Sequence, residues 1–138
     1  MSEDRVFLDT ALVLALANRQ DRYFHRAQSL FAEMRQAQEV WVTEAVLTEI
    51  GNGLARGQRP RAGAFIEMCY HTSNIHVVSV DTGVMQRALA LYRSRQDKHW
   101  GMTDCISFVV MEEHGLQAAL TNDQHFVQAG FRALLLED

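Results

Sequence analysis

The feature that most constrains the fold of this chain is the alternation of short apolar runs with longer amphipathic stretches. The runs are typical of buried strands, and apolar residues at three- and four-residue spacing are typical of helices. The expected strands are Arg5–Leu8, Val40–Val42, His76–Val80, Gln117–Leu120 and Arg132–Leu136. The expected helices are Ala11–Ala17, Asp21–Gln38, Thr43–Arg56, Pro60–Tyr70, one that begins at Asp81 or Thr82, Asp104–His114 and Asp123–Ala129. Strands that alternate with helices predict an α/β domain with a central parallel sheet covered on both faces.

Signals for helix ends refine this pattern. Thr43 fits an N-cap, Thr103 can cap the helix that follows it, and Gly115 ends that helix. The helix Asp104–His114 is apolar nearly all round, so we expect it to be central in the domain.

The length and charge of the chain limit its possible functions. At 138 residues we expect one domain, residues 1–138, long enough for a real core. The formal net charge of −4 argues against a general basic nucleic-acid binder, although the location of the charges matters more than their sum. All basic residues except Lys98 are arginines. Arginine suits bidentate phosphate contacts, although a compositional bias of the source genome explains this preference equally well.

Nothing in the sequence indicates export or membrane insertion. Cys69 and Cys105 form neither a CxxC motif nor a zinc spacing, and their apolar neighbours are typical of free, buried thiols. The charged N-terminal residues are unlike a signal peptide, and the apolar run Leu12–Ala17 is too short to span a bilayer. We therefore expect a cytoplasmic protein with no membrane partner.

Four carboxylates stand where a parallel α/β fold would bring them together. Asp9 follows the first expected strand, and Asp123 closely follows the fourth. Asp104 opens a helix, and Glu49 lies inside one. Ligands of open parallel sheets bind beyond the carboxyl ends of the strands. The four acids therefore predict one pocket at that edge of the sheet.

Carboxylates gathered in one pocket need a counter-charge, because like charges at close range cannot all stay ionised. A hard divalent cation with oxygen ligands is the usual counter-charge. Each acid also has an ordinary structural use: Asp9, Asp104 and Asp123 as cap, turn or first-turn residues, and Glu49 on a solvated helix face. The pattern as a whole points to metal-dependent phosphoryl chemistry.

Four segments, in their order along the chain, resemble the PIN-domain nucleases, and within them the VapC-like toxins of type II toxin–antitoxin pairs. These segments are Val6-Phe7-Leu8-Asp9-Thr10, Thr43-Glu44-Ala45-Val46-Leu47-Thr48-Glu49-Ile50-Gly51-Asn52, Gly101-Met102-Thr103-Asp104-Cys105 and Leu120-Thr121-Asn122-Asp123. The resemblance covers essentially the whole chain. It implies a parallel five-stranded sheet, an acidic Mg²⁺ or Mn²⁺ site and endoribonuclease activity. It also implies a homodimer and a small antitoxin partner encoded nearby.

The resemblance assigns the chemistry to the four acids. It implies that Asp9, Glu49, Asp104 and Asp123 are the catalytic residues and hold the metal or its waters. Hydrolysis of RNA then needs no covalent intermediate, because a metal-activated water can attack phosphorus directly.

Four other residues are candidates for a supporting role. Thr10 and Thr121 stand beside the acids and, in the resemblance, support the site by hydrogen bonding; ordinary cap and turn roles are equally open. Asn52 lies three residues after Glu49, on nearly the same helix face, and could orient Glu49 or touch RNA. Asp97 matches an acidic position often seen in this subgroup, and its role stays open.

Contacts to the RNA substrate have weaker signals. The RNA-contact candidates that follow the Glu49 helix are Arg56, Arg59 and Arg61. A second basic cluster is formed by Arg19, Arg22 and Arg26. Either cluster could equally be a solvated face. Among the aromatic residues that could stack on bases, Trp100, expected in a loop, is a better candidate than Tyr23 or Phe24.

Other classes of protein fit the sequence less well. A signalling receiver domain needs an adjacent acidic pair after its first strand and a lysine after its fifth, whereas this chain has only Asp9 there and Lys98 lies elsewhere. The DxD motif of an Asp-nucleophile phosphatase is absent. The histidines form no HxxxH or HxH pattern, which argues against a His-ligated zinc site, and no GxGxxG loop supports nucleotide binding. The alternative that stays open is a protein that uses the PIN fold as a binding module without turnover.

Overall fold

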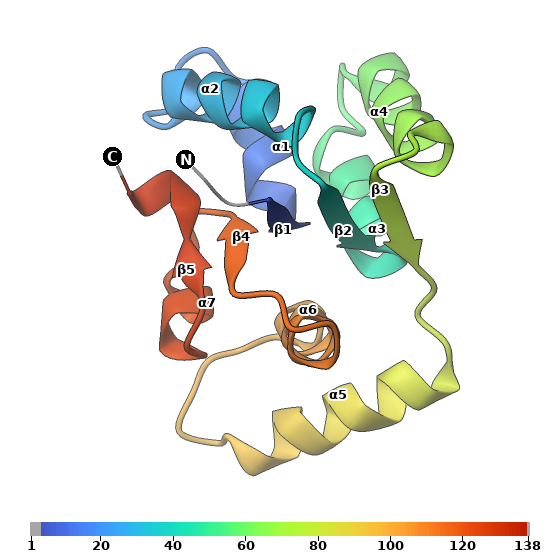
Figure 1. The fold of residues 1–138 in the computed structure, drawn as a ribbon, viewed down its shortest axis with the longest axis vertical. Helices are drawn as coiled ribbons and strands as arrows, with labels where there is room; N and C mark the ends of the chain where they lie inside the picture. The colour runs from blue at the N-terminus through green and yellow to red at the C-terminus, as the bar shows by residue number, and fades with distance from the viewer. Residues whose placement is uncertain (1–3, 138) are drawn as a thin grey trace.

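The computed structural model describes residues 4–137, which form a five-stranded sheet surrounded by helices (Figure 1). The strands are β1 (Arg5–Leu8), β2 (Glu39–Thr43), β3 (Ile75–Val78), β4 (Ala118–Leu120) and β5 (Arg132–Ala133). The helices are α1 (Thr10–Leu16), α2 (Phe24–Met34), α3 (Glu44–Gly53), α4 (Arg59–His71), α5 (Thr82–Ser94), α6 (Met102–Glu113) and α7 (Gln124–Gln128), followed by a 3-10 helix at Leu134–Leu136.

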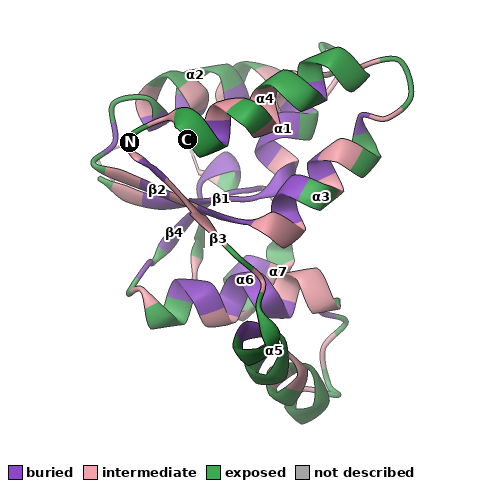
Figure 2. Ribbon diagram, turned by 90° about the vertical axis from the view of Figure 1, so that its right-hand side faces the viewer, coloured by how far each residue is buried: buried purple, intermediate pink, exposed green. Residues whose placement is uncertain are grey.

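All strands of the sheet are parallel, and their spatial order is β3-β2-β1-β4-β5. Helices α1 to α4 lie on one face of the sheet and α5 to α7 on the other (Figure 2). The expected α/β class, with a parallel sheet of five strands, is therefore confirmed. The chain runs from β1 to β2 on one side, whereas β4 pairs with β1 on the other, so the strand order reverses between β1 and β4. Such a switch point opens a crevice at the carboxyl ends of the two strands.

The core extends over both faces of the sheet, and its centre is β1 and β4. Val6, Phe7 and Leu8 of β1 and every residue of β4 are buried. Phe126 of α7 is also fully buried, with its ring centroid 6.4 Å from that of Phe7 and 5.0 Å from that of Phe108 in α6. These ring contacts hold the short helix α7 against β1 and α6.

The ends of α3 and α6 agree with the sequence signals. Thr43 Oγ1 accepts a hydrogen bond from the Val46 N–H at 3.2 Å and caps α3. Helix α6 is terminated by Gly115, whose φ is +66°, and the Leu116 N–H then donates to the Met111 carbonyl at 2.8 Å. This is a Schellman ending, which glycine adopts without steric cost. As expected of a central helix, α6 buries residues along most of its length.

Two expected helix starts are wrong, because an acidic side chain caps a different turn in each case. The cap expected at Thr103 is at Gly101, since Asp104 accepts the Gly101 N–H at 3.0 Å. The helix expected from Asp21 begins at Phe24, since Asp21 Oδ1 accepts a backbone N–H two residues further on at 2.8 Å and forms a turn there.

The third strand differs from the expected His76–Val80. It is β3, Ile75–Val78, which pairs with β2. Because β2 ends at Thr43, directly opposite the last residue of β3, the ladder has no partner beyond that point. The length of this strand is therefore set by its neighbour.

The last strand was expected over Arg132–Leu136, but β5 stops after Ala133 and the chain turns into the 3-10 helix. In a strand, Leu134 and Leu135 would point to opposite faces of the sheet. The 3-10 turn buries both, with 1% and 3% of their surfaces exposed. Burial of two consecutive leucines thus outweighs strand continuation at the edge of the sheet.

Two smaller expectations concern cysteines and membranes. Cys69 and Cys105 are free and buried, as their apolar neighbours indicated. Within residues 4–137, no helix is both long and apolar enough to cross a membrane.

The Phe126 contacts generate a prediction about stability. We expect Phe126→Ala to lower the free energy of unfolding by about 3–5 kcal/mol, because it removes a fully buried ring and leaves a cavity. The control is Val127→Ala in the same helix, where the side chain is 46% exposed and the expected change is small. Urea unfolding followed by circular dichroism measures both. Equal stability of the two variants would contradict this role of Phe126.

Candidate metal centre and active site

The four acids predicted from the sequence line one pocket. Asp9, Glu49, Asp104 and Asp123 border a cavity of about 550 Å³, together with Thr10, Ala11, Leu14, Asn52 and Asn122. The pocket lies beyond the carboxyl ends of β1 and β4, which is the crevice that the reversal of strand order creates. None of the described residues that line this pocket is a lysine or an arginine.

Asp9 is positioned by the register of β1 against β4. Leu8 pairs with Leu120, so the next residues along each strand, Asp9 and Thr121, are neighbours. Thr121 Oγ1 donates a hydrogen bond to Asp9 Oδ2 at 2.8 Å, and both residues are buried. Asp9 is also the N-cap residue of α1, but its side chain makes no capping hydrogen bond. Its carboxylate is therefore oriented by Thr121, which follows the neighbouring strand, and does not cap α1.

Glu49 reaches the pocket from the middle of α3. Thr10 Oγ1, at the first position of α1, donates to Glu49 Oε1 at 2.7 Å. The side chain of Glu49 is therefore tied to the end of β1 and is not a freely solvated group. Asn52, one turn later in α3, is exposed and lines the same pocket.

Asp104 and Asp123 enter the pocket from two helix starts. Asp104 lies in the first turn of α6, where its Oδ2 accepts the Gly101 N–H at 3.0 Å. Asp123 is the N-cap of α7, and its Oδ1 accepts the His125 N–H at 2.8 Å. Both carboxylates thus combine a helix-end role with a place in the pocket, because each uses one oxygen for the helix and retains the other.

Sequence reasoning missed His125. Its Nδ1 lies 2.9 Å from Asp104 Oδ2 and 3.5 Å from Asp123 Oδ1. Possible donor atoms of these three residues all lie within 4.8 Å of one another. The histidines had been set aside because they form no local metal-binding pattern, and only the fold brings His125 to Asp104. The available signal was its place two residues after Asp123, in the first turn of a helix. Asn122, which lines the pocket, was not singled out either.

The surroundings of Asp9 raise the pKa of its carboxyl group. Burial is the main cause that raises the pKa of Asp9 from 3.8 to about 6. Hydrogen bonds from the Thr121 side chain and the Thr10 backbone lower this pKa, and the negative charges of Glu49 and Asp123 raise it. The charged form of Asp9 is thus disfavoured in the metal-free protein. Only 8% of the surface of Asp9 is exposed, so water compensates little of this cost.

The donor set of the pocket fits a hard divalent cation. It offers carboxylate oxygens from four residues, of which Asp9 is buried with its pKa raised by burial and by neighbouring negative charge. Oxygen donors are the ligands that Mg²⁺ and Mn²⁺ prefer. A bound cation would remove the repulsion that the fold imposes, and no basic side chain of the described pocket lining does so.

The other sequence candidates lie outside this pocket. Asp97 is exposed and accepts hydrogen bonds from Arg95 Nε and Nη2, both at 3.1 Å. Trp100, expected to be available for stacking on bases, is only 6% exposed; its indole packs edge-on against Phe108 and donates to Gln128 at 3.0 Å. That expectation is wrong, because the loop carrying Trp100 folds over the core.

The arginine candidates are distributed over a neighbouring surface. Arg56 and Arg59 are exposed and line neither the acidic pocket nor the groove described next. Arg61 and Arg19 line that groove. In the second basic cluster, the Arg22 guanidinium lies 5.1 Å from the centroid of the Tyr23 ring.

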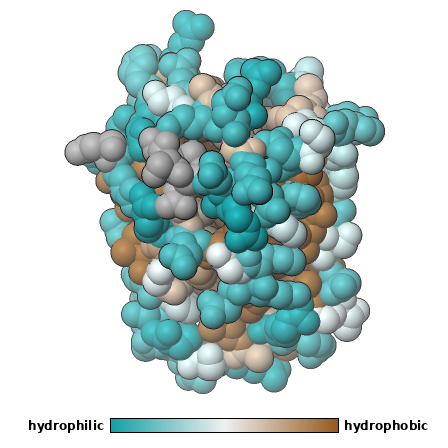
Figure 3. Space-filling model, in the orientation of Figure 1, coloured by the Kyte–Doolittle hydropathy of each residue, from teal (hydrophilic) through white to brown (hydrophobic). Residues whose placement is uncertain are grey.

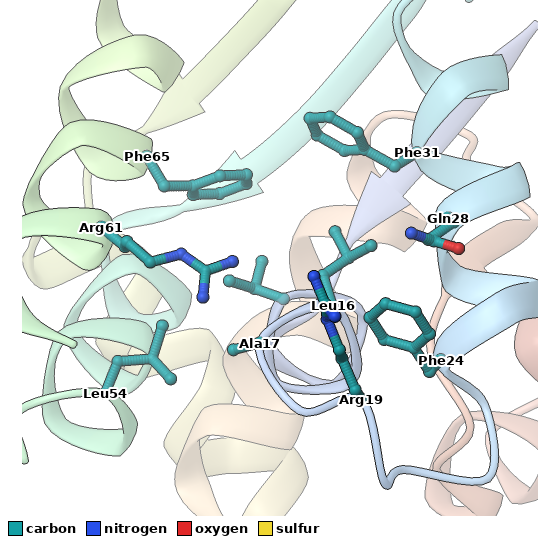
Figure 4. A pocket seen from close by; sticks show the side chains of 10 residues that line it. Leu16, Ala17, Arg19, Phe24, Gln28, Phe31, Leu54, Arg61 and Phe65 are labelled. Atoms are coloured by element: carbon teal, nitrogen blue, oxygen red, sulfur yellow. The ribbon is translucent and has the colours of Figure 1, made fainter. Parts of the chain in front are cut away.

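A larger apolar groove lies on the other side of α1. It has a volume of about 760 Å³. Its lining comprises Val13, Leu16, Ala17, Arg19, Phe24, Gln28, Phe31, Leu54, Arg61 and Phe65. In Figure 4, Phe31 and Phe24 from α2 and Phe65 from α4 surround Leu16, and the guanidinium of Arg61 extends into the space between them. The groove is thus an aromatic-walled hollow that is also lined by two arginines, Arg19 and Arg61.

A second apolar cavity lies on the opposite face of the sheet. It has a volume of about 580 Å³ and lies between α5 and α6, with Leu91, Phe108 and Phe131 among its lining residues. Figure 3 shows hydrophobic surface low in this view and along both side edges, within a mostly hydrophilic face.

Comparisons with known proteins agree with this fold and site. The PIN domain family model matches residues 6–132. The crystal structure of VapC20 from Mycobacterium tuberculosis, a sarcin–ricin loop cleaving toxin, is similar with a TM-score of 0.80; the identity is 26%, over 91% of this chain and 95% of that chain.

More distant structures share the fold alone. FitAcB from Neisseria gonorrhoeae is 16% identical with a TM-score of 0.62, over 93% of this chain and 95% of that one. VapBC2 from Rickettsia felis, solved bound to a DNA fragment from its promoter, is 10% identical with a TM-score of 0.63, over 94% and 96% of the two chains. No curated protein matches the chain by sequence.

A parallel α/β domain with an acidic pocket at a switch point defines a class of proteins suited to metal-dependent phosphoryl chemistry. Within that class, this chain belongs to the PIN domain family. PIN nucleases use divalent metal ions, and the similarity to a VapC toxin supports a toxin endoribonuclease.

The raised pKa of Asp9 predicts how stability depends on pH. Because the pKa is higher in the folded state, about 6, than in the unfolded state, about 3.8, folding takes up a proton between these values. The metal-free wild type should therefore lose about 3 kcal/mol of stability as the pH rises from about 4 to about 6. Asp9→Asn removes the group that titrates. We expect it to match the wild type near pH 4 and to exceed its stability by about 3 kcal/mol above pH 7.

Urea unfolding in EDTA across this pH range measures the difference. The control is Glu67→Gln on α4, whose carboxylate is 73% exposed and which should follow the wild-type profile. Parallel profiles for Asp9→Asn and the wild type would show that burial of this carboxylate has no energetic cost.

Proposed function

We propose that this protein is a Mg²⁺- or Mn²⁺-dependent endoribonuclease that hydrolyses RNA phosphodiester bonds as the toxin of a toxin–antitoxin pair. The observation that carries the proposal is the convergence of Asp9, Glu49, Asp104 and Asp123 on one pocket whose described lining has no basic side chain. Membership of the PIN family and the similarity to a VapC toxin support the same activity. The compartment that we infer for an enzyme acting on cellular RNA is the cytoplasm.

The four carboxylates would hold the ion, and the residues around them keep the carboxylates in place. When bound, a divalent ion supplies positive charge to the phosphoryl oxygens and acidifies a water for attack at phosphorus. Thr121 orients Asp9 and Thr10 orients Glu49 through the hydrogen bonds described above. Asn52 is exposed at the rim of the pocket, where its amide can donate to a phosphate.

We infer that the arginines beyond α3 contact the RNA backbone. Arg56 and Arg59 are exposed, and they follow the helix that carries Glu49. Guanidinium groups there would hold phosphates of the RNA backbone while leaving base recognition to other groups.

The primary test is cleavage of labelled RNA by the purified protein. We expect cutting with Mg²⁺ or Mn²⁺ and none with EDTA. Asp9→Asn and Asp104→Asn should each lower the rate at least about 100-fold, because direct ligands contribute more than the 10–100-fold typical of residues that support ligands. Single-stranded RNA, transfer RNA, a sarcin–ricin loop oligonucleotide and single-stranded DNA form the substrate panel.

Glu67→Gln is again the matched control, since it removes a charge that is 73% exposed and lies on α4. Full activity of either aspartate variant would contradict the assigned site. No cutting of any RNA by folded wild type that binds Mn²⁺ would favour the alternative of a PIN-fold binding module without turnover.

We infer that an antitoxin segment binds the apolar groove beside α1. The aromatic walls formed by Phe24, Phe31 and Phe65 suit an apolar face of a helix, and Arg19 and Arg61 at the groove suit acidic side chains beside that face. The arginines can thereby serve partner recognition instead of, or as well as, RNA contact. An antitoxin seated there would lie against α1, whose first residue Thr10 supports Glu49.

The groove generates a binding prediction. Co-expression with the small protein encoded next to this gene should yield a complex, and Phe65→Ala should weaken it at least about tenfold, as truncation of a buried aromatic anchor does at interfaces. Glu67→Ala on the same helix, with a side chain that is 73% exposed, should leave the affinity unchanged. Titration calorimetry measures both, and an unaffected Phe65→Ala complex would place the antitoxin elsewhere.

A homodimer is the remaining part of the proposal. Met85 and Tyr92 lie seven residues apart in α5, on one face of the helix, and are 41% and 47% exposed. Large apolar side chains exposed in this way suit a subunit interface. Helix α5 is therefore the surface that we assign to dimer formation.

A further inference from the structure

His125 lies against Asp104, one of the residues that line the acidic pocket, in a place that helix formation alone does not require. The fully buried Phe126 anchors α7 to the core, and this sets its neighbour His125 beside Asp104, with 29% of the His125 side chain exposed. The imidazole Nδ1 lies 2.9 Å from Asp104 Oδ2, a contact between residues 21 positions apart in the chain. It is thus a tertiary contact made to one of the four carboxylates.

The hydrogen at this contact belongs to the imidazole. An ionised carboxylate is only an acceptor, so Nδ1 must carry the proton that Asp104 Oδ2 accepts. A neutral imidazole protonated on Nδ1 can donate this hydrogen bond, as an imidazolium can. The contact therefore needs no change in the charge of His125.

This contact leaves Asp104 with two unlike oxygens. Oδ2 accepts from both the Gly101 N–H, at 3.0 Å, and His125 Nδ1, whereas Oδ1 accepts no hydrogen bond from the residues that the structure describes. Two donors on the same oxygen restrict the rotation of the carboxylate about its Cβ–Cγ bond. One oxygen is thereby committed to the protein, and the other is available to a cation.

We propose that His125 is a positioning residue, which fixes the Asp104 carboxylate so that a single oxygen, Oδ1, is presented to the metal ion. The inference rests on the proposed function, because it assumes that the pocket binds a divalent ion. Supporting residues of this kind typically change metal affinity 10–100-fold when they are removed. The rival role is direct ligation through the imidazole, which the proximity of the three side chains also permits.

Amide substitutions separate the two roles. In His125→Asn the side-chain amide nitrogen takes the place of Nδ1, so the donor to Asp104 is kept while the distal ring nitrogen is lost. In His125→Gln the amide reaches the position of the distal nitrogen, Nε2, and no donor stands at Nδ1. His125→Ala removes both.

The measurement is Mn²⁺ affinity of the full chain, by calorimetry and by the electron paramagnetic resonance signal of free Mn²⁺. We expect His125→Ala and His125→Gln to bind Mn²⁺ about 10–100-fold more weakly than the wild type, and His125→Asn to stay near the wild-type value. Gln124→Ala, an exposed neighbour in α7, is the control and should bind as the wild type does. Thermal unfolding in EDTA checks that all variants are folded.

Wild-type affinity in a folded His125→Ala protein overturns the inference, as does a His125→Asn protein that binds as weakly as His125→Ala. If His125→Ala does not fold, the comparison of the asparagine and glutamine variants decides the question, and equal affinities overturn the inference. Failure of the wild type itself to bind Mn²⁺ refutes the metal site of the proposed function instead, so the two failures are distinguishable.

Discussion

The parallel pairing of β1 with β4 is the constraint on which the site depends. It sets Leu8 opposite Leu120, and the next residue of each strand then meets the other in the buried hydrogen bond from Thr121 to Asp9. The same pairing makes the junction of β1 and β4 the point where strand order reverses, which opens the crevice. A slip of one residue in this register would turn Asp9 toward the opposite face of the sheet and remove its carboxylate from the pocket.

The pocket brings four carboxylates together in surroundings that disfavour the ionised form of Asp9. Burial and the charges of Glu49 and Asp123 raise the pKa of Asp9 to about 6, so the metal-free protein holds this carboxylate at a cost. Hydrogen bonds from Thr10, Thr121 and His125 keep the acids oriented while leaving other oxygens available. A bound divalent ion would turn the repulsion into attraction, so stability and metal binding are coupled through the same side chains.

The acidic pocket and the apolar groove share α1 as their common wall. Leu14 lines the pocket, whereas Val13 and Leu16 line the groove. Leu14 packs closely on the end of α3: a Cβ added at Gly53 would lie 3.0 Å from Leu14 Cδ2. In the proposed function, an antitoxin bound in the groove would contact α1, the helix that also lines the acidic pocket. Binding in the groove could thereby affect the acidic pocket through α1.

The sequence by itself determined the α/β class, the strand and helix order, and the four acids at the pocket. The class, the element order and the places of Asp9, Asp104 and Asp123 follow from local periodicity and from the rule that parallel strands end at one edge, which needs no knowledge of side-chain contacts. Glu49, inside a helix, was assigned mainly by the resemblance to the PIN-domain nucleases. The cap at Thr43 and the ending at Gly115 were equally readable, since each depends on a few neighbouring residues.

Some strand ends and side-chain contacts depend on residues far away in the sequence, and only the tertiary structure decided these. The end of β3 is set by β2, and the turn after Ala133 by burial of two leucines. Trp100 was expected to be available for stacking on bases but packs in the core, and His125 was not expected at the site but contacts Asp104. Both contacts join residues that meet only when α6, α7 and the sheet have packed together. Local sequence patterns identify the residues that can form a site. The contacts that orient those residues come from side chains far away in the sequence, and local patterns do not show which distant residues will meet.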